Sequence, residues 1–164
     1  MGLEIERKFL LSGDGWRREV SRSVGMRQGY LSREAGKASV RVRLEGDRAN
    51  LNIKAAVVGS ARAEFEYAID AAEAAEMLAT LCVGRVEKTR HYVERDGCVW
   101  EIDEFSGDNA GLIVAELELA SADQPFARPD WLGREVTDDR RYYNHSLSQH
   151  PYGQWTDAER HRAN

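Results

Sequence analysis

The sequence predicts an antiparallel α+β domain or a β-barrel built from about eight strands and three short helices. Segments with period 2, the strand period, recur along most of the chain. Short polar or Gly-bearing links join many of them, which favours antiparallel neighbours. No proline occurs before Pro125, so few positions interrupt a sheet. The predicted strands are 3–10, 39–44, 51–55, 63–69, 86–93, 99–105 and 112–119, with a further candidate at 25–31.

Helical signals are fewer. Asp70 and Glu73 resemble a capping box before an Ala-rich helix over 74–81. A second short helix is expected over 16–24, and Thr137 is expected to cap a third that runs to about Gln149. Residues 1–150 thus form one domain, and the polar, aperiodic tail 151–164 is expected to be disordered.

Composition excludes several classes of function. The chain has 164 residues and a net charge of −5, which disfavours nonspecific nucleic-acid binding. It contains no apolar run of about 20 residues and no signal-peptide core at its start, so no membrane association is expected. Cys82 and Cys98 have no metal-type spacing and are expected to be free thiols in the cytoplasm. The histidines, His145 among them, are not spaced as zinc ligands and are expected to be structural or exposed.

Charged residues occur as like-charged doublets at strand spacing, where residues i and i+2 share one face of a strand. The doublets are Glu4 and Glu6 (followed by Lys8), Arg41 and Arg43, Glu64 and Glu66, Lys88 and Arg90, Glu101 and Asp103, and Glu116 and Glu118; Lys54 stands alone. The opposite faces are largely apolar. A sheet with one buried and one solvated face explains any single doublet.

The whole set is harder to explain in that way, because like charges that face each other destabilise a sheet. Such doublets are stabilised where the acids share a cation and the bases share an anion. Carboxylate oxygens suit Mg²⁺ or Mn²⁺, and Arg and Lys suit phosphate oxygens. A metal-bound polyphosphate needs both kinds of group, and a closed sheet would direct all of them into one lumen.

These residues resemble the CYTH domain family, the triphosphate tunnel metalloenzymes. Glu4-Ile5-Glu6-Arg7-Lys8 matches the Glu-x-Glu-x-Lys signature of that family. The later strands follow in the family's order, and the match covers roughly residues 3–147. The matching segments are 40–43, 52–54, 64–67, 87–90, 101–103 and 116–118, with further likeness at 28–31 and 135–138.

The resemblance implies a closed eight-stranded antiparallel β-barrel, a tunnel with a few short helices packed outside. It implies metal-dependent hydrolysis of a triphosphate, most of all of inorganic triphosphate, by a metal-activated water in a charged tunnel, and a homodimer. One position departs from small bacterial members. This chain has Arg140 in Asp139-Arg140-Arg141-Tyr142, where they commonly have lysine, so the role of this position is in question.

On this hypothesis, one set of side chains binds the triphosphate and another holds the metal ion. The triphosphate is bound by Lys8, Arg41, Arg43, Lys54, Lys88 and Arg90. Glu4, Glu6, Glu116 and Glu118 hold Mg²⁺ or Mn²⁺, and these four and Lys8 are the expected catalytic residues. Asp103 completes the metal shell, and Glu64, Glu66 and Arg140 have less defined roles.

Other functions remain open at this stage. Adenylate cyclase and thiamine or nucleoside triphosphatase belong to the same family, and the lumen charges do not separate these activities because they contact only the phosphate chain. A non-catalytic polyphosphate-binding module and a plain scaffold are alternatives from other classes.

Overall fold

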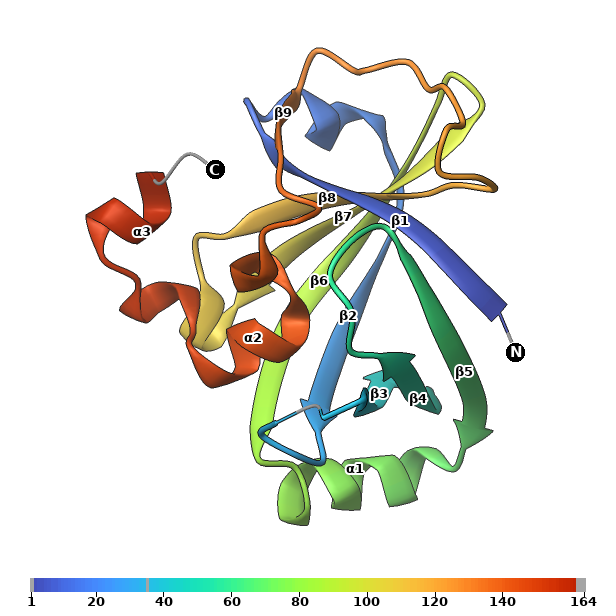
Figure 1. Cartoon of the computed structure of the whole chain (residues 1–164), viewed down its shortest axis with the longest axis vertical. Coiled ribbons are helices and arrows are strands. Elements are labelled where there is room, and N and C mark those ends of the chain that lie inside the picture. Colours follow the sequence, from blue (N-terminus) through green and yellow to red (C-terminus); the bar gives the residue numbers. More distant parts are fainter. Residues whose placement is uncertain (1, 35, 162–164) are drawn as a thin grey trace.

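A computed structural model describes residues 2–34 and 36–161. Its strands form one sheet in the order β5-β4-β3-β2-β6-β7-β8-β1-β9, and a further pairing of β5 with β1 closes eight of them into an antiparallel barrel (Figure 1). The barrel strands are β1 (Gly2–Leu11), β2 (Val20–Tyr30), β3 (Ala38–Glu45), β4 (Arg48–Ala55), β5 (Ala61–Ile69), β6 (Gly84–Arg95), β7 (Cys98–Ser106) and β8 (Ile113–Glu118). The predicted closed eight-stranded barrel is therefore confirmed, and the short strand β9 (Leu132–Glu135) extends it beside β1.

Apolar side chains cover the outside of the barrel on two sides. On one side, Phe9, Trp100 and Leu117 belong to a buried cluster with Trp16 and Trp131, which come from segments outside the barrel. On the other side, helix α1 (Ala71–Thr80) packs on β3 and β4 (Figure 1). The polarity of the barrel is thus the reverse of an ordinary domain, because its apolar face points outward under these covering segments.

The predicted helix after Asp70 is confirmed as α1. The Asp70 side chain accepts hydrogen bonds from the backbone N–H groups of Ala72 and Glu73, as an N-cap residue does. Beyond the helix, a Cβ on Gly29 would lie 2.6 Å from the Cys82 Sγ. Glycine at this position of β2 therefore allows the segment after α1 to approach the barrel wall closely.

A second apolar cluster closes one end of the lumen. Val86, Phe105 and Val114 lie at inward-facing positions of β6, β7 and β8, two residues from the charged residues of the same strands. Against them pack Leu147 of helix α2 (Asn144–Gln149), Tyr142 of the 3₁₀ helix η3 (Arg140–Tyr142) and Trp155. The C-terminal segment therefore forms an apolar floor beneath the charged part of the barrel.

Three local expectations differ from the structure. Residues 16–24, expected to be helical, form a 3₁₀ helix η1 (Gly15–Glu19) that runs directly into β2. Thr137 caps no helix. Its hydroxyl accepts a hydrogen bond from the Lys8 backbone N–H (3.0 Å) and donates one to Glu135 (2.8 Å), and Asp139 caps η3 instead.

The third difference concerns the expected disordered tail, of which the structure describes residues 151–161. It contains η4 (Tyr152–Gln154) and α3 (Asp157–His161), and Trp155 between them is only 5% exposed. Residues 162–164 lie outside the described residues. In the part of the chain that the structure describes, no helix is long and apolar enough to cross a membrane.

Candidate functional site

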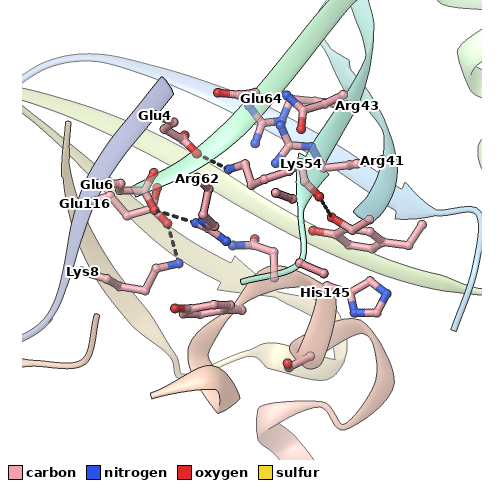
Figure 2. Close-up of a pocket in the computed structure, with 18 of the residues that line it drawn as sticks. Glu4, Glu6, Lys8, Arg41, Arg43, Lys54, Arg62, Glu64, Glu116 and His145 are labelled. Atoms are coloured by element: carbon pink, nitrogen blue, oxygen red, sulfur yellow. Dashed lines mark hydrogen bonds and ion pairs between the residues drawn. The ribbon is translucent and has the colours of Figure 1, made fainter. Parts of the chain in front are cut away.

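The barrel encloses a cavity of about 280 Å³, and side chains from all eight of its strands reach the wall (Figure 2). The predicted site residues on the wall are Glu4, Glu6, Lys8, Arg41, Arg43, Lys54, Glu64, Glu66, Lys88, Arg90, Glu116, Glu118 and Arg140. Residues that the sequence prediction did not include are Arg62, Asn52, Glu101, Tyr143, Asn144 and His145. The period-2 doublets therefore converge on one space, as predicted, with the exception of Asp103.

Most carboxylates collect on the part of the wall formed by β8, β1 and β5. The register places Glu6 opposite Glu118 and Lys8 opposite Glu116. Each lysine beside them has an acidic partner (Figure 2): Lys8 Nζ lies 2.9 Å from Glu116 Oε1, and Lys54 Nζ lies 2.6 Å from Glu4 Oε2. At rest, the lysines of this side are thus neutralised by the carboxylates that surround them.

Burial and neighbouring charges shift the pKa values of these carboxylates. Burial, aided by the nearby charge of Glu116, raises the pKa of Glu6 to about 7. Burial and the charges of Glu4 and Glu64 also raise the pKa of Glu118. Burial opposes ionisation of Glu116 as well, but Lys8 and Arg90 hold its pKa well below the usual range. This side of the wall therefore has more acidic groups than its own bases can compensate.

Asp103 does not reach the cavity. Its carboxylate is 0% exposed and accepts hydrogen bonds from Lys88 Nζ (2.5 Å) and from Arg90 Nε (2.8 Å) and Nη2 (2.9 Å). The prediction that Asp103 completes a metal shell is therefore not supported, because both oxygens already hold two site cations in place. Glu101, its partner in the doublet, lines the cavity and pairs with Arg90.

Two arginines on β3 have no acidic partner. Among the described residues, no carboxylate lies within 4.0 Å of the guanidinium of Arg41 or Arg43, although Arg41 is only 8% exposed. Arg43 donates two hydrogen bonds to the neutral amide oxygen of Gln28, both of 3.1 Å. Burial, with the charges of Arg41 and Arg90, lowers the pKa of Arg43 to about 10. This part of the wall holds uncompensated positive charge and suits an anion.

Arg62 and Tyr143 connect the acidic side to the floor. The Arg62 guanidinium lies 3.9 Å from Glu6 and stacks over the Tyr143 ring at 4.9 Å (Figure 2). The Tyr143 hydroxyl accepts a hydrogen bond from the Gly59 backbone N–H and donates one to the Thr137 carbonyl oxygen. The signal for Arg62 was present in the sequence, because it shares the strand face of Glu64 and Glu66 at period 2.

His145, expected to be structural or exposed, lines the cavity from α2. Its ring contacts Tyr30 edge-on at 4.7 Å, and its Nε2 lies 3.1 Å from the Ser32 carbonyl oxygen. No sequence pattern could have placed it there, because its position depends on how α2 packs across the barrel.

The donor chemistry fits a hard divalent cation. Glu4, Glu6 and Glu118 supply carboxylate oxygens, and burial, together with neighbouring carboxylates, raises the pKa values of Glu6 and Glu118, a cost of ionisation that a bound cation would reduce. Within residues 2–34 and 36–161, however, no three carboxylate, histidine or cysteine side chains already surround one point as a metal site does. The acidic side therefore provides suitable ligands, which the resident lysines and arginine occupy.

Comparison with known proteins agrees with this arrangement. The family model of the CYTH domain matches residues 2–150. An inorganic triphosphatase of Acetivibrio thermocellus is 46% identical over 153 residues, which cover 93% of this chain and 97% of that protein. An inorganic triphosphatase of Nitrosomonas europaea is 39% identical over 151 residues, 88% of this chain and 96% of that protein.

Solved structures show the same fold. The crystal structure of an inorganic triphosphatase superimposes with a TM-score of 0.65 at 36% identity, covering 90% of this chain and 95% of that one. The PH1012 protein of Pyrococcus horikoshii, at 18% identity, shares the fold with a TM-score of 0.58, covering 73% of this chain and 80% of its own.

Proposed function

Because the chain belongs to the CYTH domain family, we propose that it is an enzyme that hydrolyses inorganic triphosphate to pyrophosphate and phosphate with the help of a divalent cation. The observation that carries this proposal is that Arg41, which is buried, and Arg43, which is half-buried, have no carboxylate partner among the described residues, although the other four predicted bases of the wall are each paired with a carboxylate. A linear polyanion is the class of ligand that this uncompensated charge would attract.

Six bases would bind the phosphate oxygens: Lys8, Arg41, Arg43, Lys54, Lys88 and Arg90. Arg41 and Arg43 would not have to leave a carboxylate of the described residues to do so. Phosphoryl transfer depends mainly on positioning and on stabilising charge that develops on the phosphate oxygens, and fixed guanidinium groups supply both. Arg90, held by Asp103, Glu101 and Glu116, has the most restricted geometry of the set.

Glu4, Glu6, Glu116 and Glu118 would hold Mg²⁺ or Mn²⁺. Such an ion, when bound, neutralises phosphate charge and lowers the pKa of water. The resident pairs explain why an anion needs a cation here. An anion that arrived alone would have to take Lys8 and Lys54 from Glu116 and Glu4, which would leave Glu4 without its lysine and Glu116 with Arg90 alone.

The inorganic substrate is favoured over adenylate cyclase, thiamine triphosphatase or nucleoside triphosphatase activity. Both relatives reported above carry the name inorganic triphosphatase. In addition, the cavity of about 280 Å³ is lined mainly by charged groups that contact phosphates, with few apolar side chains for an organic group. A non-catalytic polyphosphate binder would not need the acidic side of the wall.

Phosphate release from tripolyphosphate, pyrophosphate, ATP and thiamine triphosphate tests the proposal, with Mg²⁺ and Mn²⁺ in turn and cyclic AMP measured in parallel. We expect tripolyphosphate to be the preferred substrate and excess chelator to abolish release. The double variant Glu4→Gln, Glu6→Gln should be folded and inactive. Binding of tripolyphosphate without any phosphate release would instead favour the binding module, and full activity in chelator would refute the role of the cation.

Two further expectations remain proposals. We propose a homodimer, which light scattering coupled to gel filtration would test at several protein concentrations. We also propose a cytoplasmic location, which the two free thiols, Cys82 and Cys98, support. Fractionation of cells that produce the protein would test it.

A further inference from the structure

Two amides, the buried Gln28 and the half-buried Asn144, accept hydrogen bonds from two of the cations at the cavity. Gln28 on β2 is 1% exposed, and its Oε1 accepts hydrogen bonds from both Nε and Nη2 of Arg43 at 3.1 Å. Its Nε2 donates to Asn144 Oδ1 (3.1 Å) and lies 3.4 Å from the Tyr30 hydroxyl. Asn144 Oδ1 also accepts a hydrogen bond from Lys88 Nζ at 3.1 Å. A chain of amides thus runs from Arg43 to Lys88.

The topology explains why this chain is needed. Arg43 lies on β3 and Lys88 on β6, and β2 separates these two strands in the sheet. Gln28 lies opposite Arg43 in the register of β2 with β3, so its side chain can span the space between the two bases. Asn144 is the first residue of α2 and completes the link from the floor.

The chemistry of an amide differs from that of the carboxylates elsewhere on the wall. Both accept hydrogen bonds from a cation and fix its orientation, but only a carboxylate also cancels the charge. Lys8, Lys54 and Arg90 are each paired with a glutamate of the cavity wall, whereas Arg43 contacts only an amide oxygen. Lys88 has one buried acid, Asp103, and takes its second acceptor from Asn144 rather than from another acid.

We infer that Gln28 and Asn144 are positioning residues that orient Arg43 and Lys88 without neutralising them, so that this part of the wall keeps its positive charge for the triphosphate. The inference rests on the proposed function. The pKa shifts of the two bases agree with this inference. Burial lowers the pKa of Arg43 to about 10 and that of Lys88 to about 7, and neither base has enough acidic neighbours to offset the effect of burial. The substrate would supply the missing negative charge.

Single isosteric substitutions test the inference, because they replace one amide nitrogen by oxygen and add one negative charge. In Gln28→Glu, the new carboxylate would pair with Arg43 and compete with phosphate. We expect KM for tripolyphosphate and Kd for pyrophosphate to rise about 10- to 100-fold, the effect of one charge-assisted interaction. We expect kcat to change less than about 3-fold, because the loss is in substrate binding. Asn144→Asp should act in the same direction through Lys88.

Stability distinguishes positioning without charge from a merely structural role. A new carboxylate among uncompensated cations should leave the melting temperature of the ligand-free protein unchanged or higher, although binding is weaker. A structural role would produce the opposite pattern, with a lower melting temperature and little change in the pyrophosphate Kd. Gln154→Glu is the matched control, because it adds the same charge at an exposed position in η4 and should alter neither quantity.

The proposed activity and the inference about the two amides can be refuted independently of each other. A wild-type protein that releases no phosphate from any triphosphate would end the proposed activity, while calorimetric binding of pyrophosphate would still test the amides. Unchanged anion affinity in folded Gln28→Glu would overturn the inference. If that variant does not fold, Asn144→Asp decides in its place, and unchanged affinity there would overturn it equally.

Discussion

Removal of the Arg41 side chain should separate catalysis from stability, because among the described residues this cation has no carboxylate partner to lose. Arg41 is 8% exposed, and no carboxylate lies within 4.0 Å of its guanidinium among the described residues. Loss of one buried group that stabilises developing charge costs about 3–4 kcal/mol of barrier, so Arg41→Ala should lower kcat/KM about 10²- to 10³-fold. Arg41→Lys keeps the charge without the fork of donors and should fall between this variant and the wild type.

The same variant should be about as stable as the wild type. The pKa of Arg43 is lowered to about 10, and after burial the charge of Arg41 is the largest cause. The whole shift corresponds to roughly 3 kcal/mol of unfavourable energy for charged Arg43, and loss of Arg41 relieves part of it. This relief should offset the lost packing of the side chain, so we expect an unfolding free energy within about 1 kcal/mol of the wild type.

Phosphate release from tripolyphosphate and urea denaturation measure the two effects. Arg27→Ala is the control, since Arg27 is exposed on the same strand face as Gly29, which points away from the lumen. It should retain wild-type kcat/KM. An Arg41→Ala protein with kcat/KM near that of the wild type would refute an anion site at this arginine. A large loss of stability would refute the assignment of uncompensated charge.

Further predictions concern three other residues, Lys88, Tyr143 and Trp155. Pyrophosphate affinity should weaken as pH rises through about 7, because burial lowers the pKa of Lys88 to about 7 and its deprotonation removes a cation. In calorimetry, Lys88→Arg should remove this part of the dependence and leave the part that comes from Glu6, whose pKa burial raises to about 7. The same shift should affect stability. At pH values above 7, the unfolded chain binds more protons at Lys88 than the folded protein does, so the unfolding free energy of the ligand-free protein should increase with pH, by up to about 1.4 kcal/mol per pH unit. Tyr143→Phe keeps the ring under Arg62 but loses two hydrogen bonds, so it should lower the unfolding free energy measured by urea denaturation by about 1–3 kcal/mol. An unchanged unfolding free energy would contradict the link to Gly59. Trp155→Ala should cost about 3–5 kcal/mol because this residue is buried against Tyr142, whereas a disordered tail would give no loss.

Most of the barrel strands were predictable because they obey a simple local rule. Residues at period 2 separate a charged face from an apolar one, and this rule fixes which side chains share a surface. Closure of the barrel does not follow from that rule, because it depends on the pairing of β1 with β5, which are far apart in the sequence. It was inferred from the family resemblance, which supplied the global topology.

The errors lie where long-range packing decides local structure. Residues 16–24 carry no strong strand pattern, yet β2 begins at Val20 because its first residues pair with β6. Trp155 looks like part of a polar tail, but its partners Tyr142 and Phe105 come from other parts of the chain. A period-2 pattern likewise cannot report depth within the barrel. Asp103 therefore shares a face with Glu101 and still lies beneath Lys88 and Arg90.

The chemistry of the cavity depends on which charges are paired more than on how many there are. The sequence assigned six bases equally to the triphosphate. The structure divides them, since Lys8, Lys54, Lys88 and Arg90 each have a carboxylate within reach, and Arg41 and Arg43 have none among the described residues. A paired base gives up an existing interaction when it binds phosphate, whereas an unpaired one only gains. The side of the barrel that carries β3 should therefore contribute most of the net affinity for the anion, although it supplies the smaller number of bases.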